Sequence, residues 1–358
     1  MDVLEKKTLK VTRGFTYTYY TSPAKDGRPT LLLIHGFPDA PDTYEDAIRD
    51  YLLPNGYGVI AVDCLGYNGT SKPTDMESYN MQLMTQDLKE IVDKEGLDKV
   101  ISVGHDWASI PCNALLCRPN ISRLLLSSIL TLMNRFQQGS AIAQRFYNFH
   151  PDRVCGLILL NVSYMPPSPE PFNLDNVLEL TKSIFGYGTH WYWKLFTADD
   201  GAQVLDGHLD AMWDVAHGEP ETWLETLCYP DGVRNFVLAD KRQPTMAYAT
   251  EERKQKWIAS MKEGGFDAPL NYYRSMVFGV QHKADANIPK ENIPVKRPFL
   301  FWGGKRDMVC RPELLQGSLD AGLIPDSTQV VVDSGHWAHL DKPKEFGEAL
   351  VGWLKAKF

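Results

Sequence analysis

Two aspartates and a histidine lie just beyond apolar runs of the sequence, where they could act together on a substrate. Asp106 comes after the run KVISV, Asp307 after PFLFW, and His336 after TQVVV. A carboxylate is ionised at neutral pH, so an aspartate can attack an electrophile without the help of a base. A histidine that a second carboxylate orients can take a proton from water. We therefore expect Asp106 to be a nucleophile, His336 a general base, and Asp307 the group that orients His336.

The residues around Asp106 predict the sharp strand-to-helix turn known as a nucleophile elbow. In the sequence GHDWA, small residues stand two positions before and two positions after Asp106, as a tight and strained turn requires. An aspartate after a strand is also a common helix cap, so this turn alone leaves two interpretations open. The chain order of nucleophile, acid and histidine favours the catalytic one, because it is the order found in α/β-hydrolases.

A second loop, with the sequence HGFP, could stabilise a developing negative charge. It follows the apolar run TLLLI, and its Gly36 and Pro38 suit a loop that turns backbone N–H groups toward an anion. We expect the N–H groups of Phe37 and Trp107 to form an oxyanion hole, with His35 as part of the same motif. The alternative is that HGFP is a plain turn.

These candidate residues need a sheet to position them, and the rest of the sequence predicts one. Short apolar runs alternate with longer amphipathic stretches, which is typical of a parallel sheet with crossover helices. The runs end in Gly, Asp, Asn or His, and ligand sites in such sheets gather at the carboxyl ends of the strands. We expect helices over 79–96 and 342–358. The expected buried strands cover 30–36, 57–63, 99–106, 154–161, 297–304 and 328–333.

The pattern changes in the middle of this predicted core. The proline-rich stretch PPSPEPF, residues 166–172, is a hinge, and the segment behind it is rich in tryptophan and tyrosine and lacks strand alternation. We therefore expect an α/β core formed by residues 1–164 and 288–358, with a helical cap over 165–287 inserted between its two parts.

Five motifs together resemble those of epoxide hydrolases with the α/β-hydrolase fold. They are HGFP, DCLGYNGTSKP, GHDW, GGKRD, and GHW followed by DKP. The resemblance covers nearly the whole chain apart from the segment after Trp107. It implies a mostly parallel sheet with flanking helices and an inserted helical cap. It also implies two cap tyrosines, and the matching positions are Tyr273 in LNYYR and Tyr192 in YWKLF. Either tyrosine could instead be part of the packed core.

The resemblance implies a reaction in two steps that converts a small hydrophobic epoxide and water into a vicinal diol. Asp106 attacks a ring carbon and forms an alkyl-enzyme ester, while Tyr192 and Tyr273 protonate the leaving oxygen. His336, oriented by Asp307, then activates the water that hydrolyses the ester. The implied chemistry requires neither a metal nor an organic cofactor. It fits a cytoplasmic role in detoxification or secondary metabolism.

The composition narrows the range of partners. The 358 residues carry 37 Lys and Arg against 45 Asp and Glu, a net charge of −8, which disfavours nucleic acid and anionic membrane surfaces as partners. The longest apolar run, 124–133, is too short to span a bilayer, and the sequence predicts no signal peptide. The six cysteines show neither disulfide nor zinc spacing, so we expect reduced thiols in the cytoplasm. The sequence does not predict an oligomeric state.

Residues 108–138 do not fit the rest of the pattern. They contain three Arg but no Asp, Glu or Lys, unlike the acidic remainder of the chain. Without them the chain reads GHDW-GSAIAQRFYNFHPDRV, an elbow that runs smoothly into a helix. We interpret the segment as an atypical insertion that stems from a retained intron. The alternative is a genuine surface insertion.

Two other functions stay open at the level of the sequence. A haloalkane or haloacetate dehalogenase shares most of these motifs and would release halide. A catalytically impaired or ligand-binding α/β-hydrolase homologue is the second alternative, because the insertion enters the chain just behind the expected nucleophile.

Overall fold

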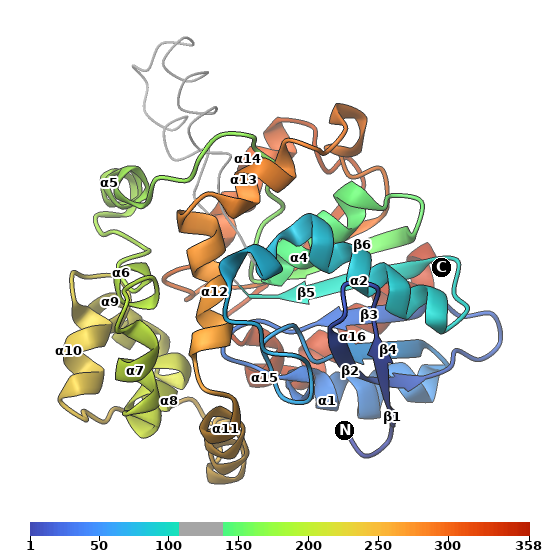
Figure 1. Cartoon of the computed structure of the whole chain (residues 1–358). Coiled ribbons are helices and arrows are strands. Elements are labelled where there is room, and N and C mark those ends of the chain that lie inside the picture. The colour runs from blue at the N-terminus through green and yellow to red at the C-terminus, as the bar shows by residue number, and fades with distance from the viewer. Residues whose placement is uncertain (107–138) are drawn as a thin grey trace.

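An eight-stranded sheet forms the centre of the fold (Figure 1). The computed structural model of the chain describes residues 1–106 and 139–358, and the observations below concern those residues. The strands lie in the order β1-β2-β4-β3-β5-β6-β7-β8. β2 pairs antiparallel with β1 and β4, and the other neighbours pair parallel. The strand bounds are Glu5–Lys10 (β1), Thr16–Ser22 (β2), Thr30–Ile34 (β3), Gly58–Val62 (β4), Val100–His105 (β5), Val154–Leu160 (β6), Phe299–Gly304 (β7) and Ser327–Val332 (β8).

The six predicted strands are confirmed as β3 to β8. β3, β4, β5 and β7 are buried along their whole length, which explains their continuous apolar sequences, because helices cover both faces of a central parallel strand. β8 lies at one edge of the sheet and is only partly buried. The sequence did not predict β1 and β2, since EKKTLK and TYTYYTS are dominated by charged and hydroxyl-bearing side chains.

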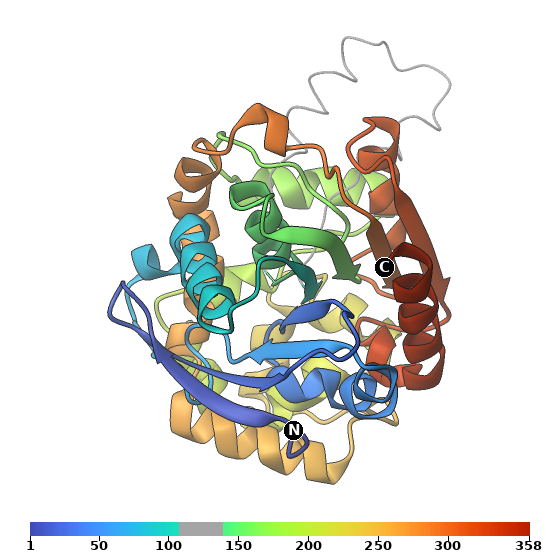
Figure 2. The same ribbon diagram turned by 90° about the vertical axis from the view of Figure 1, so that its right-hand side faces the viewer.

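Helices cover both faces of this sheet (Figure 2). α2 (Met81–Lys94) and α4 (Gly139–Phe149) share one hydrophobic cluster with Leu32 of β3. α16 (Pro343–Lys357) shares a second cluster with Leu33, the next residue of the same strand. Successive side chains of a strand point to opposite faces, so neighbouring residues of β3 serve opposite layers of the core. α2 and α16 are the two helices that the sequence predicted.

Between β6 and β7, where the sequence predicts a helical cap, the chain forms a series of helices. In Figure 1, α5 to α11 gather in a group beside the sheet, and α12 runs between this group and the core. The remaining helices are α1 (Glu45–Ala47), α5 (Leu174–Phe185), α6 (Trp193–Phe196), α7 (Gly201–Asp206), α8 (Leu209–His217), α9 (Trp223–Thr226), α10 (Gly232–Leu238), α11 (Glu251–Gly264), α12 (Asp267–Val277), α13 (Val280–Asp285), α14 (Gln316–Asp320) and α15 (Ala338–Asp341). Among the described helices, none is long and apolar enough to cross a membrane.

Hydrogen bonds fix the cap-side helices to loops of the core. The indole N–H of Trp257 in α11 donates to the carbonyl oxygen of Pro38 at 2.7 Å. The hydroxyl of Tyr272 in α12 donates to the carbonyl oxygen of Leu65 at 2.9 Å. The first of these contacts reaches the HGFP loop, so the position of that loop depends on the cap as well as on the sheet.

His217, the last residue of α8, is a buried histidine between the cap and the core. The centroid of its ring lies 3.9 Å from that of Trp213 and 4.6 Å from that of Trp337. Neither ring nitrogen has a hydrogen-bond partner among the residues that the structure describes. Burial lowers the pKa of His217 from 6.5 to about 4, because the charged form would lose its hydration.

Replacing His217 with phenylalanine should make the fold less sensitive to acid. Because the pKa is depressed in the folded chain, the unfolded chain binds more protons between pH 6.5 and 4, and stability falls as the pH falls through that window. Below this window, His217 lowers the free energy of unfolding by roughly 2–4 kcal/mol relative to neutral pH. Phenylalanine keeps the ring contacts and has no proton to bind. Melting temperatures measured from neutral to acidic pH should decline less steeply in His217→Phe, and parallel declines would contradict the assignment.

Candidate active site

Asp106 lies directly after β5 in a backbone conformation that few residues other than glycine adopt. Its φ is +80°, and the residue is only 6% exposed. Positive φ at a residue with a side chain costs roughly 1–3 kcal/mol and is found at functional sites. A nucleophile elbow requires strain of this kind, because the turn must lift one side chain out of the sheet toward a substrate. The predicted turn at Asp106 therefore has the geometry expected of an elbow.

The HGFP loop makes direct contact with the Asp106 carboxylate. The backbone N–H of Phe37 donates to Oδ2 of Asp106 at 2.7 Å. A Cβ atom on Gly36 would lie 2.1 Å from the Cβ of Asp106, so only glycine allows the two loops to approach this closely. The predicted role of Phe37 as an oxyanion-hole donor is therefore compatible with its position.

His35 and Pro38 shape this loop from its two ends. His35 is buried, its Nε2 accepts a hydrogen bond from the N–H of Cys64 at 3.0 Å, and its Nδ1 donates to the carbonyl oxygen of Gly36 at 2.8 Å. Burial lowers the pKa of His35 to about 4, so the ring is neutral and can accept at one nitrogen while it donates at the other. The peptide bond between Phe37 and Pro38 is cis.

His336 connects the two aspartates. Its Nε2 lies 2.5 Å from Oδ1 of Asp106, and its Nδ1 lies 2.6 Å from Oδ2 of Asp307. The other oxygen of Asp307 accepts hydrogen bonds from the backbone N–H groups of Val309 at 2.9 Å and Cys310 at 2.7 Å. The structure thus brings together three residues whose outermost members in the sequence are 230 positions apart.

Tyr192 and Tyr273 line the same cavity as Asp106 and His336. The cavity has a volume of about 40 Å³. Tyr192 lies just before α6, Tyr273 belongs to α12, and the centroids of their rings are 6.2 Å apart. The rest of the lining is largely apolar and includes Phe37, Pro38, Phe196, Met212, Val215, Ala216, Trp223, Leu227, Val309 and Trp337.

A larger cavity of about 360 Å³ also borders Pro38, between the HGFP loop and α11. Trp107, the second predicted oxyanion-hole residue, lies outside the described residues, as do residues 108–138.

Comparisons with known proteins bear on the fold of the chain. Residues 29–137 match a family model described as the alpha/beta hydrolase fold. An epoxide hydrolase from an endophytic Streptomyces has a similar structure, with a TM-score of 0.74 at 22% identity over 99% of this chain and 96% of that chain. Epoxide hydrolase VrEH1 from Vigna radiata has a TM-score of 0.72 at 20% identity over 99% of both chains. The chain has the α/β-hydrolase fold.

Curated relatives of this chain are named as epoxide hydrolases. Bifunctional epoxide hydrolase 2 of Rattus norvegicus is 25% identical over 334 residues, which are 92% of this chain and 52% of that protein. Epoxide hydrolase B of Mycobacterium tuberculosis is 24% identical over 93% of each chain. The chain spans about half the length of the rat, pig and mouse relatives that it matches. The predicted resemblance to epoxide hydrolases with this fold is therefore confirmed.

Burial and charge act in opposite directions on the three buried groups of the candidate site. Burial raises the pKa of Asp106, and His336 and the Phe37 N–H offset only part of that effect. Burial would also raise the pKa of Asp307, but the charge of His336 and the hydrogen bonds to the carboxylate bring it below its usual value. Burial alone would lower the pKa of His336, whereas Asp307, Cys310 and Asp106 raise it well above 6.5. Asp307 is therefore the fixed negative charge of the group.

Asn161, directly after β6, is a site residue that sequence reasoning missed. Its Nδ2 donates to Oδ2 of Asp307 at 3.0 Å and to the carbonyl oxygen of Gly335 at 3.2 Å. The residue is fully buried and has a φ of +63°. It therefore links Asp307 to the loop that carries His336. The only signal in the sequence was a polar residue at the end of an apolar run.

Ser140, at the start of α4, is hydrogen bonded to the elbow. Its N–H donates to the carbonyl oxygen of Asp106 at 3.0 Å, and its hydroxyl donates to that of Gly104 at 3.1 Å. Without residues 108–138, Ser140 would be the third residue after Asp106, the spacing at which an N–H reaches the carbonyl oxygen in a turn. We propose that the elbow and α4 form one unit, and that 108–138 were inserted into it by retention of an intron.

Replacing Asn161 with leucine should weaken the Asp307–His336 pair. Loss of a donor to a buried charge should lower the free energy of unfolding by roughly 1.5–3 kcal/mol, measured by chemical denaturation. The downfield resonance of the proton on His336 Nδ1 should shift as well. The Asp307 oxygen that accepts this proton would no longer accept a second hydrogen bond from residue 161. Leucine at Asn287, an exposed residue of the same type, should change neither quantity. An unshifted His336 resonance in Asn161→Leu would rule out the positioning role.

Deletion of residues 108–138 should give a chain that is more stable or more active than the one described. The deletion joins Trp107 to Gly139 and shortens the connection across which Ser140 is held against the elbow. Purified full-length and deleted chains should differ in melting temperature or in turnover of a styrene-type epoxide. Equal values for both properties would contradict the proposal. A spliced transcript that still encodes 108–138 would defeat the intron origin separately.

Proposed function

We propose that this α/β-hydrolase is an epoxide hydrolase, which converts a small hydrophobic epoxide and water into a vicinal diol. The proposal rests on one observation above all, which is that Asp106, His336, Tyr192 and Tyr273 line one largely apolar cavity. A nucleophile, a base and two O–H donors in one apolar pocket are the groups that opening of an epoxide by a carboxylate requires. The names of the relatives and structural neighbours support the same reaction.

In the first step, Oδ1 of Asp106 attacks a carbon of the epoxide ring. The C–O bond of the ring breaks, and the oxygen leaves as an alkoxide that takes a proton from a tyrosine. Burial raises the pKa of Tyr192 and Tyr273 well above 10, so both hydroxyls keep their protons until a base as strong as an alkoxide forms. Oδ2 stays with the Phe37 N–H and becomes the carbonyl oxygen of the new ester.

In the second step, His336 takes a proton from water through Nε2, and the resulting hydroxide attacks the carboxyl carbon of Asp106. The negative charge that develops on Oδ2 is stabilised by the N–H of Phe37 and, in our proposal, by that of Trp107. As this charge returns to the carboxyl carbon, the bond from that carbon to Oδ1 breaks, and the diol leaves with Oδ1 and the proton that His336 took from water. The second proton of the attacking water goes back to the tyrosine, which restores the carboxylate and both hydroxyls. Ester formation has removed the charge of Asp106, which is one of the causes that raise the pKa of His336. His336 therefore loses its proton more easily at the stage when it must act as a base.

The proposed division of the chain follows from these steps. We assign residues 1–164 and 288–358 to the core that carries the nucleophile, the acid and the base, and residues 165–287 to the cap that carries the two tyrosines. The ring of Trp223 in the cap lies 5.2 Å from that of His336, between centroids, and helps to exclude bulk water from the ester. A hydrophobic substrate fits the apolar lining of the cavity.

Replacing both Tyr192 and Tyr273 with phenylalanine should slow ester formation by about 10²–10⁴-fold, the usual contribution of a positioned acid. Tyr272→Phe is the matched control, because Tyr272 is also a buried tyrosine of α12 but donates to Leu65. Pre-steady-state measurements of ester formation from a styrene-type epoxide give the rate directly. Unchanged ester formation in the double variant, together with halide release from a haloalkane, would favour a dehalogenase instead.

Replacing His336 with glutamine should stop the reaction after the first step. The variant keeps Asp106 and both tyrosines but has no group that can take a proton from water. Intact-protein mass spectrometry should then detect the chain with one added substrate molecule, and Asp106→Asn should prevent this addition. Full diol production by His336→Gln would contradict the proposed role of His336.

A further inference from the structure

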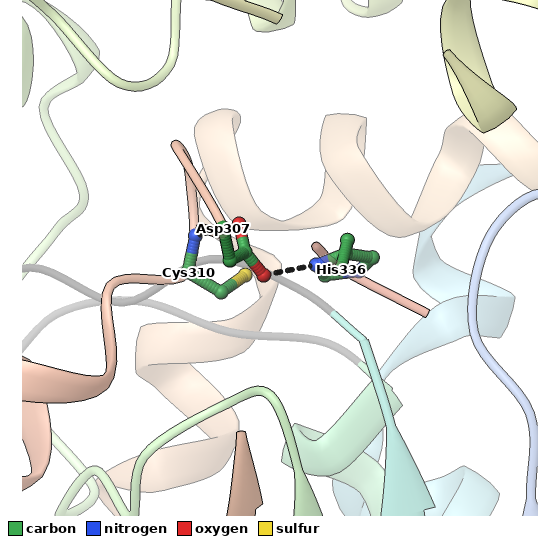
Figure 3. A group of neighbouring side chains, drawn as sticks. All are labelled: Asp307, Cys310 and His336. Carbon is green, nitrogen blue, oxygen red and sulfur yellow. Dashed lines mark hydrogen bonds and ion pairs between the residues drawn. The ribbon is translucent and has the colours of Figure 1, made fainter. Parts of the chain in front are cut away.

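Cys310 places a thiol beside the Asp307–His336 pair, and the proposed reaction makes no use of it. The sulfur of Cys310, a carboxylate oxygen of Asp307 and a ring nitrogen of His336 all lie within 4.8 Å of one another. All three residues are buried. Figure 3 shows the sulfur beside the Asp307 carboxylate, whose oxygen in turn faces His336.

These three donors match the preference of one class of metal ion. Thiolate sulfur, imidazole nitrogen and carboxylate oxygen are the ligands of Zn²⁺, whereas Mg²⁺ and Ca²⁺ select oxygen ligands alone. With metal–ligand distances of about 2.0 to 2.3 Å, the ligands of a tetrahedral zinc ion lie about 3.5 Å apart. The group therefore needs only small side-chain shifts, chiefly a separation of the Asp307 and His336 atoms that now lie 2.6 Å apart.

We propose that Asp307, Cys310 and His336 form an inhibitory site for Zn²⁺ and similar thiophilic divalent ions. The fourth coordination position would belong to water. Among the described residues, this is the one group of His, Cys, Asp and Glu side chains close enough together to hold a metal. Two small cavities lie beside the group, of which His336 lines both and Asp307 lines one.

Metal binding would block one half of the reaction. The ion takes Nδ1 of His336, the nitrogen that now faces Asp307. The remaining proton of a metal-bound neutral imidazole is then on Nε2, which can no longer accept a proton from water. Binding releases the thiol proton of Cys310 and the Nδ1 proton of His336 to solvent, so affinity increases with pH. Inhibition of ester hydrolysis rests on the proposed function, whereas metal binding itself does not.

Metal binding is tested directly with Zn²⁺ and with Co²⁺ as a spectroscopic probe. The starting chain carries serine at Cys112 and Cys117, two thiols outside the described residues, so that they do not contribute. Zn²⁺ affinity is measured by competition with a chromophoric chelator, and Co²⁺ by the near-ultraviolet thiolate-to-metal band. We expect one ion per chain with a thiolate band. Cys310→Ser should lose at least about tenfold in affinity together with the band.

Cys155→Ser is the matched control, because Cys155 is a half-buried thiol in β6 outside the group. It should keep both the affinity and the thiolate band. Unchanged affinity and an unchanged band in Cys310→Ser would overturn the site, as would failure of the starting chain to bind either ion.

Turnover of an epoxide tests the inhibition separately, with each variant compared with its own metal-free rate. Zn²⁺ should slow diol release and let the ester accumulate in the starting chain but not in Cys310→Ser. Equal inhibition of both chains would overturn the inhibitory role. Metal binding at Cys310 without any epoxide turnover would instead leave the site standing and count against the proposed function.

Discussion

The site depends on one carboxylate that is held from two sides in a strained position. Oδ2 of Asp106 accepts from the N–H of Phe37 at 2.7 Å, Oδ1 lies 2.5 Å from Nε2 of His336, and the φ of +80° keeps the side chain raised above the sheet. The two oxygens are therefore already different before substrate arrives, one in the anion-binding loop and one beside the base and the cavity. Gly36 is required for the same reason, since any side chain there would displace Asp106.

The parallel sheet explains how residues far apart in the sequence can form this contact. β3 leads into the HGFP loop, β5 into Asp106 and β7 into the loop with Asp307. The loop after β8 carries His336. Because parallel strands end at the same edge, the loops that follow them meet there. These residues could be recognised in the sequence for the same physical reason. Strands buried on both faces leave continuous apolar runs, and the polar residues just beyond the runs mark the common edge.

Other parts of the fold and site could not be predicted, because they depend on directions in space. The antiparallel strands β1 and β2 are too polar for their pattern to stand out. Asn161 could be identified as the end of a strand, but its bond to Asp307 depends on a φ of +63° that its residue type does not dictate. The spacing of the cysteines along the chain does not reveal the position of Cys310, which meets His336 only through folding. The hydrogen bond from Ser140 to Asp106, in contrast, joins two residues that are three positions apart once 108–138 are removed, which is the spacing of a turn.

The central claim is that Asp106 becomes covalently bound to the substrate, and a single turnover in oxygen-18 water tests it most directly. With enzyme in excess over a styrene-type epoxide, the oxygen that Asp106 contributes comes from the protein, and the water oxygen enters the carboxylate. The account predicts a first diol without the label and, after repeated turnovers, label in the peptide that contains Asp106. A first diol that already carries solvent oxygen, with no label in Asp106, would contradict it.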